Sequence, residues 1–252
     1  MANNNQLNSG ESDLNIPSCF QILLRNLNNL DALINVQNNY SEFYPTPEPF
    51  FYSCIVTLAT YWEVFCTDLI KEATFTLSHE LDNYTTLPVE LRRIVTKELK
   101  NDKHEFSAWK LAQNNWRGYV YSRVQNLDNN PNDLKSARPK NIEAAIVKFL
   151  GFKDFETLWV VKDKSKVEIK GSISEFLDKR NDIVHKGILL NTKIGDSEYL
   201  VSQKDFFTQL AHSFLKYFDR KLFETIGIRF YEYEVILESK KWPFNYLKEI
   251  GV

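Results

Sequence analysis

The chain has 252 residues, of which 43% are hydrophobic and 14% aromatic. This length and composition support a sizeable core and exclude a globally disordered chain. The formal net charge is −2, which excludes a strong overall field that would draw the protein to nucleic acid. Any RNA binding must therefore come from a local basic patch or from the cleft of a dimer.

The start of the chain is polar and Asn-rich, without the apolar run of a signal peptide. We expect residues 1–15 to form a disordered arm and residues 16–252 to form a single helical domain. By inspection, no stretch is long and apolar enough to span a membrane. Cys19, Cys54 and Cys66 lie far apart among apolar residues, without metal-ligand spacing, which predicts reduced core residues of a cytoplasmic protein and no metal site.

Two apolar helices are expected in the first third of the chain. Leucines at helical spacing predict a helix from about Pro17. The segment 44–49 holds three prolines and must be a stiff connector, because prolines break a helix interior. The longest apolar helix should follow over about 50–81. Glu63 lies in an aromatic stretch of that helix and is either a solvated residue or a support for a functional group elsewhere.

A basic stretch with interleaved aromatic residues follows, from about residue 88 to 126. Arg92, Arg93 and Lys97 are its candidate RNA-binding residues, because phosphates pair with cations and bases stack on rings. Acidic residues are interspersed, so an ordinary solvated helix face is the alternative. Residues 88–140 as a whole are a possible inserted helical segment.

The middle of the chain is less regular. Residues 141–150 predict a short helix and residues 152–159 a small one. Residues 160–169 alternate apolar and charged side chains, which is typical of a strand or an extended loop. Lys164 and Lys166 form a second candidate phosphate contact, and a solvated loop is the alternative.

Residues 173–187 predict an amphipathic helix, because the apolar residues recur at helical spacing. Ser172 or Ser174 is expected to cap its start, and Gly187 is expected to end it. The segment 188–202 then predicts a small β-hairpin or a long loop. A strong amphipathic helix follows over 205–225, and an aromatic tail ends the chain.

Polar residues at the end of the helix over 173–187 suit chemistry at a phosphodiester. Asn181 and His185 are four residues apart and share one face, and the long side chain of Arg180 can swing towards them. An arginine holds a phosphate in a bidentate fork, and a histidine moves a proton near neutral pH. We therefore assign phosphate binding to Arg180, proton transfer to His185 and a supporting hydrogen bond to Asn181, with Asp182 as a supporting residue.

The segment Arg180-Asn181-Asp182-Ile183-Val184-His185 resembles the R-x(4–6)-H motif of the HEPN superfamily, and its surroundings resemble the RiboL-PSP-type branch. The stretch 61–65 is similar to the Trp-Glu-x-Phe pattern of the preceding long helix in that branch. The resemblance implies an all-α, HEPN-like helical bundle that forms a homodimer. It also implies a metal-independent endoribonuclease without cofactors, whose composite active site faces two motif helices across the dimer. Glu63 would then buttress Arg180 or orient His185.

The resemblance further implies a toxin or antiviral-defence effector that cleaves tRNA or single-stranded RNA, with an antitoxin or defence partner. Some HEPN toxins carry a modifiable tyrosine two residues after the histidine, where this chain has Gly187. Two alternatives stay open. Arg180 could pair with Asp178, Asp182 or Glu63, while His185 merely caps the helix end. The whole chain could also be a non-catalytic HEPN-like module that binds RNA or a protein partner.

Overall fold

The computed structural model describes residues 17–40, 48–104, 110–125, 127, 134, 136–187 and 197–230. In these residues the fold is all-α, as predicted, and has no named strand. Seven α-helices and one short 3-10 helix make up this part of the chain: α1 (Ser18–Tyr40), α2 (Glu48–Glu80), η2 (Tyr84–Thr86), α3 (Val89–Asn101), α4 (Asn115–Gln125), α5 (Pro139–Leu150), α6 (Lys166–Lys186) and α7 (Ser197–Ile226).

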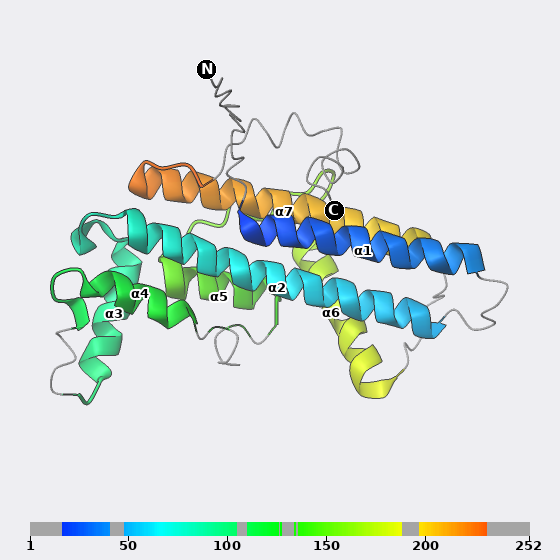
Figure 1. Cartoon of the computed structure of the whole chain (residues 1–252), viewed down its shortest axis with the longest axis horizontal. Helices are drawn as coiled ribbons and strands as arrows, with labels where there is room; N and C mark the ends of the chain where they lie inside the picture. Colours follow the sequence, from blue (N-terminus) through cyan, green and yellow to red (C-terminus); the bar gives the residue numbers. More distant parts are fainter. Residues whose placement is uncertain are drawn as a thin grey trace, which may run out of the picture.

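Helix α2 is the centre of the bundle. It contacts α1, α4, α5, α6 and α7, and Figure 1 shows α1 and α7 along one side of it and α4, α5 and α6 along the other. Its wide apolar face follows from aromatic and aliphatic residues at helical spacing. The segment Pro49–Glu80 is also long and apolar enough to cross a membrane, and half of its most apolar window is buried in the fold. By length and composition alone, the prediction that no stretch is long and apolar enough to span a membrane is therefore wrong.

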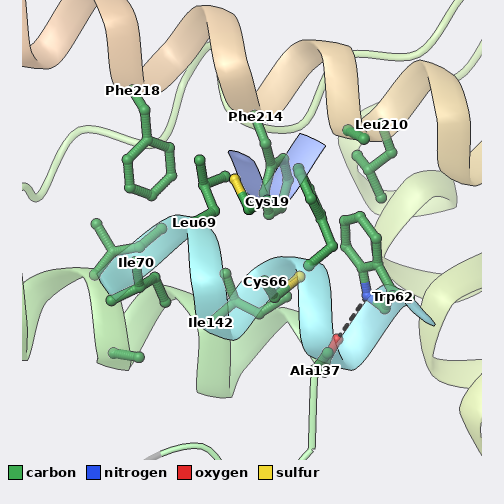
Figure 2. Close-up of a cluster of buried hydrophobic side chains, with 14 of the residues drawn as sticks. Cys19, Trp62, Cys66, Leu69, Ile70, Ala137, Ile142, Leu210, Phe214 and Phe218 are labelled. Atoms are coloured by element: carbon green, nitrogen blue, oxygen red, sulfur yellow. Dashed lines mark hydrogen bonds between the residues drawn. The ribbon is translucent and has the colours of Figure 1, made fainter. Parts of the chain in front are cut away.

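The core is continuous from one end of the bundle to the other. Figure 2 shows its middle, where Trp62 and Cys66 of α2 meet Phe214 of α7. The indole Nε1 of Trp62 donates a hydrogen bond to the carbonyl oxygen of Ala137 at 3.3 Å, which satisfies the one polar group of a side chain that is otherwise fully buried. The three cysteines are free and buried, as predicted.

Helices α3 and α4 belong to this same core rather than to a separate unit. Leu91, Val95 and Trp116 are buried within it. Gly151 ends α5 with a φ of +75°, and a Cβ added there would lie 2.7 Å from the backbone nitrogen of Leu91. Only glycine therefore permits this close approach of α5 to the start of α3. Whether residues 88–140 are an insertion stays a prediction.

Three local predictions meet a different structure. Residues 152–159 form a turn instead of a small helix. Residues 160–165 are a short connection with one isolated bridge between Val161 and Lys164, and the rest of the predicted strand or loop belongs to α6. The second half of the predicted hairpin is the first part of α7. The first half of the hairpin, the N-terminal arm and the aromatic tail lie outside the described residues.

Candidate functional site

The candidate site lies on α6, which begins earlier than the sequence predicts. Ser165 is the N-cap: its hydroxyl accepts a hydrogen bond from the backbone N–H of Glu168, and the Glu168 side chain accepts one from the Ser165 N–H. This reciprocal capping box satisfies two N–H groups that would otherwise lack partners. The predicted caps, Ser172 and Ser174, are interior residues of the helix. Gly187 ends it with a φ of +71°, as predicted.

Helix α6 buries side chains only as far as Leu177, the twelfth of its 21 residues. Ile169, Ile173, Phe176 and Leu177 enter the core, and beyond Leu177 every residue of the helix is half-buried or exposed. In Figure 1 the C-terminal half of α6 leaves the body of the bundle. The polar residues of the motif therefore lie on a projecting helix end, where a ligand or a second protein can reach them.

Arg180 is held from two sides. Its Nη2 donates to Oε2 of Glu63 on α2 at 3.1 Å, and its Nη1 donates to Oδ1 of Asn181 at 3.0 Å. The side chains of Arg180 and Glu63 are about a quarter exposed, at 27% and 24%. An ion pair at this depth is screened less than a surface pair. Glu63 thus contacts Arg180 in the way that the supporting role requires, and it does not contact His185.

His185 and Asp182 lie apart from this ion pair. The His185 side chain is exposed and has no hydrogen-bond or ionic partner among the described residues. Asp182 forms an ion pair with Lys186, 2.7 Å between Oδ1 and Nζ, so it does not compete for Arg180. The alternative in which Arg180 pairs with an acid holds for Glu63 and not for Asp182.

The helix end thus presents two different groups. Arg180 is a fixed cation whose fork retains N–H donors beyond the two that Glu63 and Asn181 engage. His185 is an exposed imidazole, a side chain that can take up and release a proton. Within the described residues there is no group of three or more histidine, cysteine or acidic side chains that could hold a metal ion. A fixed cation and a proton carrier are the parts of acid–base chemistry at a phosphodiester, and one protomer supplies one of each.

The cationic residues predicted to bind RNA on α3 are exposed but distant from this site. Arg92, Arg93 and Lys97 line one shallow hollow on the outer face of α3. Arg93 lies 3.5 Å from the acidic Glu90, in a pair that leaves it mostly exposed. Figure 1 shows α3 and the free end of α6 at different ends of the molecule. One protomer therefore does not bring this strip and the motif into one site.

The two lysines predicted as a second phosphate contact lie at the wrong end of α6. Lys164 stands 5.7 Å over the ring of Phe206, and Lys166 forms an ion pair with Glu156. Both precede or begin the helix, whereas the motif ends it, and 21 residues of helix span about 30 Å. Their role as RNA-binding residues stays a prediction, and the structure does not bring them to His185.

Two contacts that orient α6 were missed from the sequence. Arg138, just before α5, donates from Nη2 to Oδ1 of Asp178 at 2.5 Å. Lys179 lies between Glu175 at 2.9 Å and the hydroxyl of Tyr199 on α7 at 3.2 Å. Arg138 and Asp178 are 40 residues apart, so no spacing rule within one helix could have revealed that pair.

Cys66 of α2 carries a thiol, which is a potential nucleophile. It is 1% exposed, and burial, together with the charge of Glu63, raises the pKa of its thiol well above the ordinary value. A thiol reacts through its thiolate. Cys66 is therefore an inert core residue.

Comparison with known proteins agrees with the all-α fold. The model of one family, RiboL-PSP-HEPN, matches residues 19–220, which include the whole of α2 and α6. No curated protein and no solved structure matches the chain. The family match covers most of the chain and all seven described helices, except Ser18 of α1 and the end of α7 after residue 220. The chain therefore belongs to the RiboL-PSP-HEPN family.

Proposed function

We propose that this protein is a metal-independent endoribonuclease whose site is formed by Arg180 and His185. The observation that supports it is the pairing of Arg180 with Glu63, which fixes a guanidinium at the projecting end of α6, the same helix end that carries the exposed His185. Membership in the family adds a general reason, since HEPN domains generally bind RNA and often act as dimers.

Cleavage follows from these groups by attack of the ribose 2′-hydroxyl on the adjacent phosphorus. A base takes the 2′-hydroxyl proton, and an acid gives a proton to the 5′-oxygen that leaves. Arg180 binds the phosphate and stabilises the negative charge that builds up on it. The products are a 2′,3′-cyclic phosphate and a 5′-hydroxyl. Asn181 supports this by holding one arm of the guanidinium.

One protomer supplies a single His185, whereas the reaction needs both a base and an acid. A two-fold dimer that faces two α6 ends across a cleft supplies two of each group. The exposure of the α6 end leaves room for this arrangement. Asp182 and Lys186 would then form the rim of the cleft, and the RNA strand would run between the protomers.

The biological setting that we propose is a toxin or an antiviral-defence effector of the cytoplasm, restrained by an antitoxin or a defence partner. An active ribonuclease in the cytoplasm needs such restraint in its own cell. Growth arrest on expression, absent in His185→Ala, is the expected result.

The first experiment incubates the purified protein with total tRNA and with a labelled single-stranded RNA in EDTA. We expect wild type to cleave and to leave cyclic-phosphate ends, and His185→Ala and Arg180→Ala to lose cleavage by at least about a hundredfold. His79→Ala is the matched control, because His79 stacks on Phe75 of α2 and should cleave as wild type does. Wild-type rates in folded His185→Ala would contradict the proposal.

A second candidate is a non-catalytic module that binds RNA. The observation that favours it is the exposed cationic strip of Arg92, Arg93 and Lys97, which lies on one face of α3 without needing a second protomer. In that case Arg92→Gln with Lys97→Gln would weaken RNA binding, whereas Arg180→Ala would not, and no variant would cleave RNA.

A further inference from the structure

A cavity lies against α7, far from the motif. It has a volume of about 410 Å³, and the segment between α5 and α6 covers one side of it. Lys162, Lys216 and Arg220 line it, and its lining includes no carboxylate among the described residues. Val160 and Val161 form an apolar wall. This cavity is named the α7 pocket below.

Three residues that line the α7 pocket carry buried polar atoms without a hydrogen-bond partner. The described residues contain seven buried side-chain nitrogen or oxygen atoms without a hydrogen-bond partner, and four of them belong to three residues that line this pocket. They are Oγ1 of Thr157, Oη of Tyr217, and Nε and Nη2 of Arg220. Buried polar groups in folded proteins nearly always have a partner. A cluster of exceptions on one cavity points to a ligand that supplies the missing acceptors.

Two acids lie near Arg220, but they do not accept hydrogen bonds from its buried nitrogen atoms. Its Nη2 lies 3.8 Å from Asp154 and its Nε lies 3.7 Å from Glu224, both too long for hydrogen bonds. Lys221 is closer to both acids, at 3.3 and 3.4 Å. The hydroxyl of Tyr217 is also a donor, because burial raises the pKa of this group above its ordinary value.

The pocket is built from fixed elements rather than from a mobile surface. The hydroxyl of Ser213 donates to the carbonyl oxygen of Leu158 at 2.9 Å, which ties the segment 157–161 to α7. His212, Lys216 and Arg220 recur every four residues and so lie along one face of α7. Two cations on one helix face and a third, Lys162, on the segment opposite converge on one cavity.

We propose that the α7 pocket binds a phosphate monoester of mononucleotide size. A dianionic phosphate accepts several hydrogen bonds at once and is bound by Arg and Lys side chains with charge assistance. Arg220 and Lys216 bind the phosphate oxygens, Tyr217 and Thr157 donate to them, and Val160 and Val161 contact the apolar part of the ligand. The volume lies in the range of small-molecule sites.

This site is distinct from the ribonuclease motif. Lys162 precedes α6, whereas His185 lies in its last turn, and the helix between them spans about 30 Å. The inference therefore goes beyond the proposed function and does not depend on it. His185→Ala should bind the phosphate ligand as wild type does, whether or not the protein cleaves RNA.

Isothermal titration calorimetry on the purified full chain tests the site with AMP, inorganic phosphate and adenosine. AMP is expected to bind, phosphate more weakly, and adenosine not at all. Arg220→Gln should weaken AMP binding by at least about tenfold, since it removes charged hydrogen bonds. Tyr217→Phe keeps the ring and should weaken it less. Lys140→Gln, which removes an exposed cation on α5, is the matched control and should bind as wild type does.

Two arms identify the source of the phosphate. A 5′-phosphorylated dinucleotide that competes with AMP would place the natural ligand at an RNA end, and a failure to compete would assign it to a free nucleotide; both results support the site. Equal affinity for adenosine and AMP would overturn the proposal. So would an unchanged AMP affinity in both Arg220→Gln and Tyr217→Phe, or no AMP binding to folded wild-type protein at millimolar concentration.

Discussion

Among single residues, Glu63 decides how Arg180 is presented. The carboxylate reaches across from α2, and its Oε2 lies 3.1 Å from Nη2 of Arg180. Glu63→Gln removes the charge but keeps the shape, so the guanidinium loses its fixed position. We expect the rate of RNA cleavage to fall by about tenfold, because misplaced catalytic groups lose much of their effect. The free energy of unfolding should fall by only about 1 kcal/mol or less, since the pair is partly exposed.

The matched control is Glu175→Gln. Glu175 is an acid of α6 that pairs with Lys179 at 2.9 Å and is 70% exposed. The Glu175→Gln variant should have the cleavage rate and the stability of wild type. Cleavage at the wild-type rate in folded Glu63→Gln would show that Glu63 is only a structural partner of Arg180.

A second prediction at this scale concerns His212. Its ring packs edge-on against Phe20, with centroids 4.9 Å apart, and burial, followed by the charge of Lys216, lowers its pKa. The fold therefore favours the neutral imidazole, and the unfolded chain binds the proton more strongly. The contribution of the neutral His212 to stability is fully present above the ordinary histidine pKa of about 6.5. This contribution is lost as the pH falls from that value towards the lower pKa that His212 has in the folded protein.

Urea denaturation at pH 7.5 and 5.5 measures this effect. We expect His212→Phe, which keeps an aromatic ring against Phe20, to lose less stability between the two pH values than wild type. His79→Phe serves as the control for the loss of one histidine on a helix surface. An equal pH dependence in wild type and His212→Phe would contradict the assignment.

How far the site could be predicted depends on sequence distance. Arg180, Asn181 and His185 lie within one turn and a half of helix, so a local motif reveals them. Glu63 is 117 residues from Arg180, and only the resemblance to a known pattern singled it out. The α7 pocket was missed because that helix was interpreted by its apolar face, although His212, Lys216 and Arg220 stand at helical spacing on the other side.

Among the elements, α6 depends most on its ends. The sequence predicts a cap at Ser172 or Ser174, whereas the capping box is formed by Ser165 and Glu168. Ser165→Ala should lower the free energy of unfolding by about 1 kcal/mol, because the backbone N–H of Glu168 at the helix start loses its partner. Chemical denaturation followed by circular dichroism measures this change.

Ser172→Ala is the matched control, since Ser172 is half-buried in the interior of α6. It should change stability by less than about 0.5 kcal/mol, because alanine is the better helix former. A larger loss in Ser172→Ala than in Ser165→Ala would place the helix start where the sequence suggested it.

The long helices could be predicted from the sequence, but their joints could not. Apolar spacing gives α1, α2 and α7 because each has a broad buried face. The segment 152–159 has the same spacing, yet it forms a turn, since Phe152, Leu158 and Trp159 are buried from an irregular backbone. Tertiary packing overrides local preference there. The start of α7 was missed for the opposite reason, because Tyr199 and Val201 favour strands although the apolar helix continues through them.

For the whole molecule, the net charge of −2 and the single His185 per chain give the same requirement. In the proposed mechanism, no global field draws RNA to the protein, and one protomer does not supply both the acid and the base for cleavage. A cleft between two projecting α6 ends would bring two Arg180 and two His185 side chains together. Each cleft would then need both protomers to be intact, and this can be tested by mixing.

Wild type and His185→Ala are combined in equal amounts, unfolded together and refolded, so that dimers form at random. Random pairing gives about one quarter wild-type dimers, one half mixed dimers and one quarter mutant dimers. If one His185 is the base and the other the acid, mixed dimers are inactive, and the cleavage rate should be about a quarter of that of wild type at the same total concentration. Independent sites would instead give about a half. The same mixing with Lys140→Gln should leave the rate unchanged, and light scattering must show a dimer in each sample. A rate of one half from a dimeric mixture would contradict the composite site and leave each protomer with its own.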